Sequence, residues 1–444
     1  MNPATNILDA IRICAPDEPL KPGDERWQDF SSVRGGLALE KRVARRLESY
    51  TSGGEYVYMA VAGHRGCGKS TELYRVKKWA EDSGYLAIYT RVNEELDPFD
   101  VDYPDLLLLI SRAVEAEFRR LDWTLDRKTL KSVSDWFKSV TKIEEEEVEA
   151  SLGVETKAEF GPTVPFFAKL MVALTSRVRA GGTTKTEVRD VIRRYPKALV
   201  DNVNLLMDVA HRTLEKEGRK GLLLVFDNLD RYQPDVADRL LLQSADILKG
   251  VHCNVIYTVP ISLIYNPRGD SVEERFMTDT LPMIKVQRRD GDLHEEGVDC
   301  MLRALARRVV IGRVFDGEET ARELVWNSGG CIRDLMHLCQ EAFLGAPGEI
   351  VNAEDAGRAV ETVRSEFSRR IKTHQYPLLA RVHLSKSVTS DPDHRELLYR
   401  RDVLEYNYGE QRWADVHPVV RGVREFHNAL AREEEQEGGV VSSE

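Results

Sequence analysis

Residues 56–79 read YVYMAVAGHRGCGKSTELYRVKKW, and this stretch decides the fold. A β-rich apolar run stops at Gly63, a glycine-spaced loop follows, and an amphipathic pattern typical of a helix begins at Lys69. The loop satisfies the pattern G-x-x-x-x-G-K-[ST] in full, with Gly63, His64, Arg65, Gly66, Cys67, Gly68, Lys69 and Ser70. A strand, this loop and a helix in succession predict a phosphate-binding loop in an α/β fold.

The residue types of this loop suit the binding of a nucleoside triphosphate. Glycines let successive backbone N–H groups turn inward and form a nest for an anion, and the following helix adds the positive end of its dipole. We expect Lys69 to reach the β- and γ-phosphates, the Ser70 hydroxyl to ligate Mg²⁺, and Thr71 to lie near the α-phosphate. The alternative is a glycine-rich turn that contains Lys-Ser by chance. The predicted cofactors are ATP and Mg²⁺.

Length and charge set limits on the rest of the chain. With 444 residues it has room for two or three domains, and its net charge of −11 argues against broad wrapping of nucleic acid. No apolar run is long enough to span a membrane, and the first residues lack the pattern of an export signal. Six scattered cysteines without metal spacing suggest reduced thiols, so we expect a cytoplasmic protein.

Hydrophobic patterns divide the chain into predicted segments. We expect strands at residues 56–62, 85–92, 222–226, 253–259 and 281–286, and a helical stripe over residues 187–217 that Pro196 kinks or breaks. The predicted domains are an N-terminal lead-in (1–50), a P-loop ATPase core (51–291) with an insertion (126–182), a helical lid (292–350), a winged-helix-like module (351–432) and an acidic, disordered tail (433–444).

The insertion shows a change of period. Apolar residues alternate with polar ones over residues 148–160 and again over 166–178, with Gly161-Pro162 between the two runs. This alternation predicts a long β-hairpin. Such a hairpin would pack on its own domain or on a neighbouring subunit, or insert into a membrane.

A second candidate element of the site is the stretch GLLLVFDNLD at residues 221–230. Five consecutive apolar residues suit a central strand buried on both faces, and Asp227 would end that strand where open α/β sheets bind ligands. We expect Asp227 to hold the Mg²⁺ hydration shell opposite Ser70. Asp230 could orient the attacking water, or serve as a helix cap or the ion-pair partner of Arg231.

Further candidates are single residues. Thr258 ends another buried strand, where it could read the γ-phosphate, although β-propensity alone also explains a threonine there. Trp27 and Arg34 could line the adenine or pin the N-terminal arm to the core. Arg268 and Arg275 are candidates for an arginine that acts on the nucleotide of a neighbouring subunit, or are plain surface residues.

Taken together, GHRGCGKST, LLLVFDNLDR, Thr258 and the run SGGCIRDL at residues 328–335 resemble a AAA+ or STAND-type ATPase, with KAP- and NACHT-like bacterial relatives. The resemblance implies a small helical lid whose arginine, matched here by Arg333, reaches the γ-phosphate. It also implies nucleotide-controlled self-assembly in signalling, antiviral defence or DNA transactions. Where many such ATPases have a hydrolytic glutamate, this chain has Asn228, so slow turnover is expected.

These patterns support three hypotheses. The first is an ATP-driven switch that forms homo-oligomers and engages a protein effector. The second is a DNA-transaction ATPase that grips duplex DNA through the C-terminal module, where Arg400, Arg401, Arg412, Arg421 and Arg424 alternate with acidic residues. The third is a nucleotide-binding scaffold without turnover. The net negative charge disfavours the second hypothesis.

Overall fold

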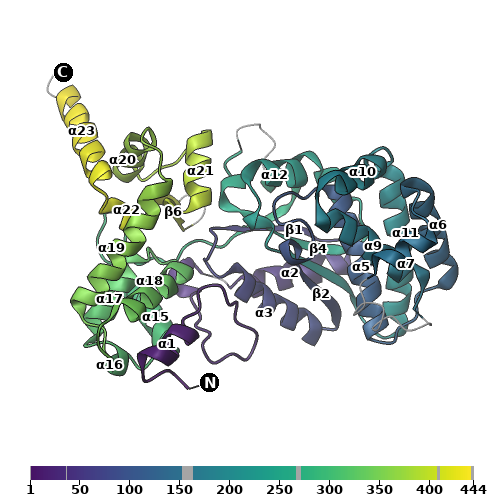
Figure 1. Ribbon diagram of the computed structural model, residues 1–444, viewed down its shortest axis with the longest axis horizontal. Helices are drawn as coiled ribbons and strands as arrows, with labels where there is room; N and C mark the ends of the chain where they lie inside the picture. The colour runs from purple at the N-terminus through teal and green to yellow at the C-terminus, as the bar shows by residue number, and fades with distance from the viewer. Residues whose placement is uncertain (1, 37, 153–163, 267–271, 408–410, 442–444) are drawn as a thin grey trace.

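A five-stranded parallel sheet forms the centre of the computed structural model, which describes residues 2–36, 38–152, 164–266, 272–407 and 411–441 (Figure 1). The strand order is β2-β3-β4-β1-β5, so β4 separates the phosphate-loop strand β1 from β3, which ends in Asp227. The strands are β1 (Tyr58–Gly63), β2 (Tyr85–Arg91), β3 (Gly221–Asp227), β4 (Asn254–Pro260) and β5 (Met277–Thr280). The predicted α/β fold with a parallel sheet is confirmed.

Helices cover both faces of this sheet. Met59 and Val61 of β1 pack on one side with α2 (Leu39–Ser52) and α3 (Lys69–Asp82), whereas Ala60 and Ala62 face the core formed with α5 (Tyr103–Arg120) and α11 (Pro196–Lys216). Alternate residues of a strand point to opposite faces, which explains the division. Burial on both faces accounts for the unbroken apolar run in β3.

Four of the five predicted strands are present, and the prediction of a fifth strand at residues 281–286 is wrong. The edge strand β5 lies just before it, and the chain leaves the sheet at Leu281, whose N–H still donates to the carbonyl of Ala62. Pro282 has no N–H for a continued ladder. The apolar residues of this segment pack instead against the lid and the C-terminal module.

The predicted β-hairpin in the insertion is also wrong within the described residues, where the chain is helical. Its first arm contains α7 (Glu145–Ser151) and its second arm is α9 (Phe166–Ala180), while residues 153–163 lie outside the described part. Buried positions in α9 such as Phe167, Leu170, Met171 and Leu174 recur at helical spacing. Several of these apolar positions fit both a helical and a strand pattern. The segment is a helix because these residues pack against α5.

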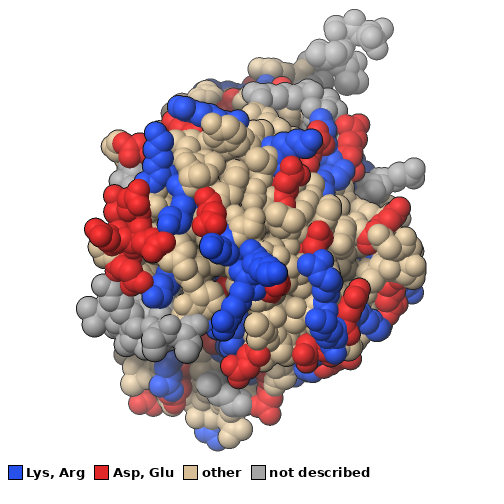
Figure 2. Space-filling view, turned by 90° about the vertical axis from the view of Figure 1, so that its right-hand side faces the viewer, with Lys and Arg blue, Asp and Glu red and all other residues tan. Residues whose placement is uncertain are grey.

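The remaining insertion helix is α6 (Arg127–Thr141). Together with α7 and α9, and with α10 (Gly182–Arg193) and α11, which follow the insertion, it forms the end of the molecule drawn at the right of Figure 1. Pro196 begins α11, so the long predicted helix is broken there, as expected for proline at a first turn. On this face Lys and Arg are interspersed with Asp and Glu over the described residues (Figure 2).

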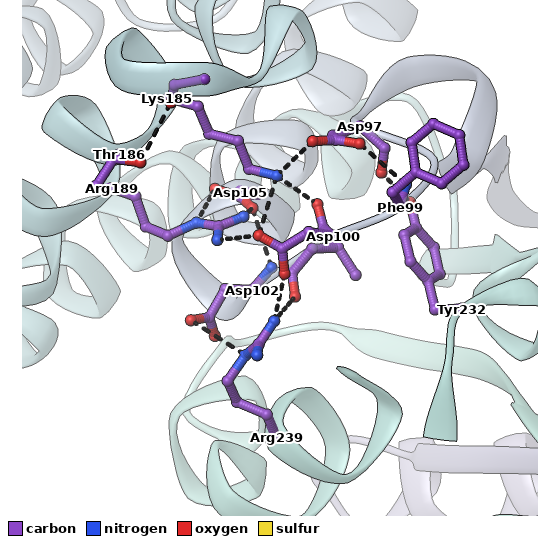
Figure 3. A network of polar contacts seen from close by, with 12 residues as sticks. Asp97, Phe99, Asp100, Asp102, Asp105, Lys185, Thr186, Arg189, Tyr232 and Arg239 are labelled. Carbon is purple, nitrogen blue, oxygen red and sulfur yellow. Dashed lines mark hydrogen bonds and ion pairs between the residues drawn. The ribbon is translucent and has the colours of Figure 1, made fainter. Parts of the chain in front are cut away.

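A network of charges attaches α10, the helix that follows the insertion, to the core (Figure 3). Lys185 and Arg189 of α10 reach Asp97 and Asp100 at 2.7 and 2.6 Å, in the loop that follows α4 (Val92–Glu95). Arg189 also pairs with the buried Asp105 of α5. Each aspartate of this acidic loop has a cationic partner, so the cluster serves as a structural joint rather than an open cation site.

The lid and the C-terminal module share one hydrophobic core, at the left of Figure 1. The lid contains α15 (Glu295–Ala306), α16 (Ile311–Val314), α17 (Glu318–Asn327) and α18 (Ile332–Gly345), and α1 (Ile7–Ile13) packs on it. The module contains α19 (Ala353–Arg370), α20 (Gln375–Ser385), α21 (Pro392–Arg400), β6 (Val403–Tyr406), β7 (Trp413–Val416), α22 (Pro418–Arg421) and α23 (Arg424–Val441). The helices α19, α20 and α21 followed by an antiparallel hairpin fit the predicted winged helix, which stays a prediction together with the domain boundaries.

The described part of the acidic tail, as far as Val441, is helical, contrary to the prediction of disorder. Helix α23 continues to Val441, and Glu433 pairs with Arg381 at 3.5 Å. Among the residues described, no helix combines the length and the apolar character needed to cross a bilayer. Short elements complete the core: η1 (Ser32–Arg34), η2 (Leu229–Arg231), α12 (Pro234–Asp238), η3 (Arg239–Gln243), α13 (Ala245–Lys249), η4 (Ile261–Leu263) and α14 (Val272–Arg275).

Candidate functional site

A cavity of about 310 Å³ opens over the phosphate loop, at the carboxyl ends of the parallel strands. Four segments of the chain meet in it: the N-terminal arm, the phosphate loop with the start of α3, the turn after β3, and the start of α18 in the lid. The lining residues include Asp17, Glu18, Arg65, Gly66, Gly68, Lys69, Ser70, Thr71, Arg91, Asn228, Asp230, Arg231 and Arg333. Six candidates of the sequence motif and two of the other candidates, Asp230 and Arg333, therefore share one cavity.

The loop requires glycines at two positions because atoms of other segments lie very close to its backbone there. A Cβ on Gly66 would lie 2.7 Å from the Cβ of Arg333, and a Cβ on Gly63 would lie 2.7 Å from the carbonyl oxygen of Leu281. Gly66 also has a φ of +84°, in the left-handed region that side chains avoid. The lid can thus rest directly on the loop backbone because the loop carries no side chain there.

Lys69 lies buried at the floor of the cavity, and all three of its N–H donors have acceptors. Its Nζ lies 2.8 Å from the carbonyl oxygens of Gly63 and His64 and 2.8 Å from Oδ2 of Asp230. Burial opposes the charge of the ammonium, but the carboxylate of Asp230 outweighs that cost and raises the pKa of Lys69. Conversely, Lys69 lowers the pKa of the buried Asp230, so both groups are charged.

Asp227 lies beneath the cavity rather than in its lining. Tyr89 of β2 donates its hydroxyl to Oδ2, and the N–H of Asn228 donates to Oδ1 at 2.8 Å. Tyr74 stacks on Tyr89 with ring centroids 4.2 Å apart, which fixes the hydroxyl that holds the carboxylate. A carboxylate accepts about four hydrogen bonds, so Asp227 keeps capacity for waters of a metal ion.

The turn after Asp227 is strained at Asn228, whose φ is +68°. Its side-chain amide donates to Oδ1 of Asn93 at 2.7 Å, and this bond ties the turn to α4. Asparagine tolerates the left-handed conformation better than most residues. The position after the strand-ending aspartate, where a glutamate was considered from the resemblance, is thus filled by a residue that adopts the left-handed backbone conformation of the turn.

Thr258 and Thr71 each hold a neighbouring segment in place. The Thr258 hydroxyl is buried and accepts from the N–H of Leu229 at 3.1 Å, and Thr258 is absent from the cavity lining. Thr71 accepts from the N–H of Leu20 at 3.1 Å and so holds the N-terminal arm beside the cavity. The γ-phosphate role predicted for Thr258 therefore depends on a rearrangement of the turn after β3.

Of the two candidates in the arm before α2, Arg34 reaches the loop and Trp27 does not line the cavity. The guanidinium of Arg34 is buried and donates to the carbonyl of Cys67. The ring of Trp27 lies under the guanidinium of Arg75 at 3.9 Å, on the outer side of α3. Both contacts attach the arm to the core, and a role for either residue in lining the adenine stays a prediction.

Arg333 projects from the start of α18 over the phosphate loop. Its N–H donates to the carbonyl of Gly66 at 3.4 Å, and its Nε lies 3.1 Å from Oδ1 of Asp17 in the N-terminal arm. Asp17 thus provides the negative charge that this arginine faces in the cavity. The motif could predict Arg333, but no local pattern marks Asp17 as its counter-ion.

The cavity fits a polyanion. Arg65, Arg91, Arg231 and Arg333 line it together with Lys69. The Nε of Arg65 is buried without a hydrogen-bond partner among the described residues, and burial lowers the pKa of this guanidinium. A bound phosphate group would supply the missing acceptor and offset that burial. The residues predicted for ATP and Mg²⁺ therefore suit such a group.

His64 links the phosphate loop to the C-terminal module. Its Nδ1 lies 3.2 Å from the carbonyl oxygen of Leu398 in α21, and its Nε2 accepts from the N–H of Glu405 in β6 at 2.8 Å. Burial, assisted by the charges of Lys69 and Arg401, lowers the pKa of His64 to about 3. A neutral ring with its proton on Nδ1 satisfies both bonds.

Glu405 gives this contact a pH dependence that can be measured. Burial raises the pKa of Glu405 to about 7, although Tyr265 donates its hydroxyl to the carboxylate and Arg412 lies nearby; Glu273 adds to the rise. The folded protein therefore binds a proton that the unfolded chain, titrating near 4.5, has lost. Stability should fall between about pH 4.5 and 7 as the pH rises.

Replacing Glu405 by glutamine should flatten this part of the pH profile. Denaturant unfolding at pH 5 and pH 8 should show a loss of about 2–3 kcal/mol in the wild type that is absent in Glu405→Gln. Glu433→Gln in the outer part of α23 is the control, and it should keep the wild-type slope. An unchanged slope in Glu405→Gln would assign the titration to another group.

The two arginines considered for action on a neighbouring subunit remain predictions. Arg268 lies outside the described residues, and Arg275 in α14 pairs with Asp246 at 3.4 Å. The C-terminal arginines are internally engaged: Arg400 and Arg421 reach Asp402 and Asp415. In this conformation Arg400 and Arg421 neutralise carboxylates of their own module.

Comparison with known proteins gives only distant likenesses. No family model matches the chain, and no curated protein matches it. Among solved structures, the Aeropyrum pernix ORC2 protein in its ADP form is 14% identical, covers 95% of this chain and 98% of its own, and has a TM-score of 0.41.

Two others are a Walker-type ATPase of Pyrococcus abyssi (15% identity, 92% and 99% coverage, TM-score 0.38) and a Thermotoga maritima RuvB Holliday junction branch migration motor (12%, 92% and 98%, TM-score 0.34). At TM-scores below 0.5 these likenesses carry no argument. The chain has the α/β architecture of a P-loop protein, and that statement rests on its own sheet, loop and cavity.

Proposed function

We propose that the chain is a Mg·ATP-dependent switch of the AAA+ or STAND kind that hydrolyses ATP slowly and self-assembles under nucleotide control. The observation that carries this proposal is the cavity that Lys69, Ser70, Asp230 and the lid residue Arg333 line together, with Lys69 paired to Asp230 at 2.8 Å. A glycine-rich turn with a purely structural role would not require buried cations at a polar cavity.

Each residue has a proposed role in this cavity. The loop from Gly63 to Gly68 would offer backbone N–H groups to the phosphates, with Lys69 as a point charge. Ser70 and Asp227 would hold Mg²⁺, which supplies charge neutralisation at the phosphates. Arg333 would sense the γ-phosphate from the lid. Asn228 in place of a glutamate supports slow turnover.

The direct test combines two measurements on the full chain. Phosphate release in the presence of Mg·ATP should be slow but above background, and particle mass should increase when a non-hydrolysable ATP analogue is added. Binding of the analogue without a change in mass would leave a nucleotide-binding protein that does not self-assemble. Absence of binding would contradict the proposal as a whole.

Asp230→Asn should slow turnover more than it weakens binding. Asp230 neutralises Lys69, so its removal frees the ammonium for phosphate and should leave affinity equal or higher. If Asp230 orients the attacking water, single-turnover phosphate release should fall about 100-fold. Asp235→Asn, a substitution in the nearby α12, is the matched control. Unaltered single-turnover rates would assign the role to another residue.

The structure gives less support to binding of duplex DNA by the C-terminal hairpin. Both strands β6 and β7 are buried, and Tyr406 and Trp413 stack on each other at 4.3 Å in a cluster with Cys67 of the phosphate loop. DNA affinity depends on exposed cations and falls steeply with salt. If anisotropy titrations of duplex DNA at several salt concentrations showed binding that weakens with salt, they would support this alternative.

A further inference from the structure

Arg65 lies in the phosphate loop, lines the cavity and has no anionic partner there. Three other cations of the cavity, Lys69, Arg91 and Arg333, each lie 2.8–3.1 Å from a carboxylate oxygen. Within the described part of the chain, no carboxylate forms an ion pair with Arg65, and its buried Nε has no hydrogen-bond partner. A buried donor without an acceptor is costly, so this side chain requires an anion that the chain itself does not supply.

The lid brings a second guanidinium to the same place. Arg333 packs on the loop backbone at Gly66, the residue after Arg65, and its Nε lies 3.1 Å from Asp17 without forming a hydrogen bond. Burial lowers the pKa of Arg65, and the nearby charge of Arg333 lowers it further. An anion with several oxygens, bound by both arginines, would offset the burial and the repulsion between the two charges.

Arg65 also lies close to the amine that marks the phosphate end of the cavity. The Nζ of Lys69 pairs with Asp230, and in this loop pattern the lysine reaches the β- and γ-phosphates. Asp230 and Arg65 influence each other's pKa, which places the guanidinium near the same amine. The ring of Tyr399, 5.4 Å from the guanidinium, orders the Arg65 side chain beside the cavity. Because Arg65 and Lys69 belong to one loop, both reach a triphosphate bound in their own chain.

We propose that Arg65 is a catalytic residue that binds the terminal phosphate held by its own loop and stabilises the charge on that group during hydrolysis. This inference rests on the proposed function. A water oxygen bonds to the terminal phosphorus, the bond from this phosphorus to the bridging oxygen breaks with its electron pair left on ADP, and both water protons leave with the phosphate as H₂PO₄⁻. Arg65 keeps its proton throughout. An arginine from a neighbouring subunit is then not required for turnover.

The first test compares single-turnover phosphate release with binding of a non-hydrolysable Mg·ATP analogue in the full chain. Arg65→Ala should release phosphate about 100-fold more slowly, as expected for one lost donor to developing charge, while analogue affinity falls only a few-fold. Arg65→Lys, which keeps the charge but not the planar fork, should lie between the two. Arg45→Ala, at an exposed arginine of α2, should behave as wild type. Equal losses of affinity and rate in Arg65→Ala would make Arg65 a binding residue only and overturn the proposal.

Binding of Mg·ADP with aluminium fluoride gives a readout that does not depend on turnover, because the fluoride complex imitates the phosphoryl group in transfer. Aluminium fluoride should tighten the binding of ADP to wild type, and this gain should be about 100-fold smaller in Arg65→Ala. The affinity for ADP alone should be the same in both proteins. An equal gain in both would overturn the proposal.

A mixture of two variants separates action within one chain from action on a neighbour. Lys69→Ala chains should bind no ATP but still carry Arg65, so they would restore phosphate release by Arg65→Ala chains only if this arginine acted on a neighbour's nucleotide. We expect no recovery, and recovery would overturn the proposal.

The outcomes also separate this inference from the proposed function. Arg65→Ala with the wild-type rate would overturn the inference and leave the proposed function intact. Wild type that binds the analogue but releases no phosphate would overturn the inference and the hydrolysis in the proposed function, whereas nucleotide binding would stand. Wild type that binds no nucleotide would overturn both.

Discussion

Lys69→Ala should lower the affinity for ATP about 100-fold or more, to the limit of detection by calorimetry. The ammonium is the buried cation at the floor of the cavity, and a charge-assisted contact to phosphate in such a place is worth about 3 kcal/mol, which is close to two factors of ten. Lys78→Ala, on the exposed part of α3, is the matched control and should bind as wild type. Undiminished affinity in Lys69→Ala would contradict the whole site.

The same substitution should also destabilise the protein, and the two effects can be separated. Without Lys69, the buried Asp230 loses its ion-pair partner and keeps only the weaker influence of Arg65 and Arg231, and breaking a buried pair typically costs about 3–5 kcal/mol. The double variant Lys69→Ala/Asp230→Asn should therefore recover most of the lost stability in denaturant unfolding but none of the affinity. Recovery of both would mean that Lys69 acts through folding rather than through phosphate.

The sequence could predict those parts of the site that are formed by consecutive residues. The phosphate loop is a motif because one turn must supply glycines, a lysine and a hydroxyl in a fixed order. Asp227 was predictable because five apolar residues before it can only be a buried strand, and the ends of parallel strands meet at one edge. The helical lid and the role of Arg333 were implied by the resemblance of a short run to other ATPases, and the role of Arg333 stays a prediction.

Pairings between distant segments were beyond prediction. The bond between His64 and Glu405 joins positions 341 residues apart, and nothing in GHRGCG states that the histidine faces a module rather than a phosphate. The pairing of Lys69 with Asp230 and that of Arg333 with Asp17 could not be predicted for the same reason. The prediction of a β-hairpin in the insertion was wrong for a different reason. Ala168, Leu170 and Leu174 fit both a period of two and a helical face, and only packing on α5 selects the helix.

Asp227→Asn should abolish the dependence on Mg²⁺ while leaving binding of ATP in the absence of the metal unchanged. The buried carboxylate is held by Tyr89 and by the N–H of Asn228, and an amide in its place keeps the size but loses the charge and half of the acceptor capacity. Phosphate release should fall about 100-fold, as expected for the loss of charge stabilisation at a transferring phosphoryl group. Titration of Mg²⁺ against phosphate release and analogue affinity measures both effects.

Tyr89→Phe distinguishes a metal-holding carboxylate from a structural one. It removes one hydrogen bond from Asp227 and leaves the stacking on Tyr74 intact, so the Mg²⁺ concentration at half-maximal rate should rise a few-fold while the rate at saturating Mg²⁺ is kept. Asp246→Asn, an exposed residue paired with Arg275, is the control for a lost surface carboxylate. If Asp227→Asn retained its response to Mg²⁺, the aspartate would cap β3 and the metal would depend on Ser70 and another carboxylate. Asp230 is then the nearest candidate, because it is the carboxylate that reaches into the cavity.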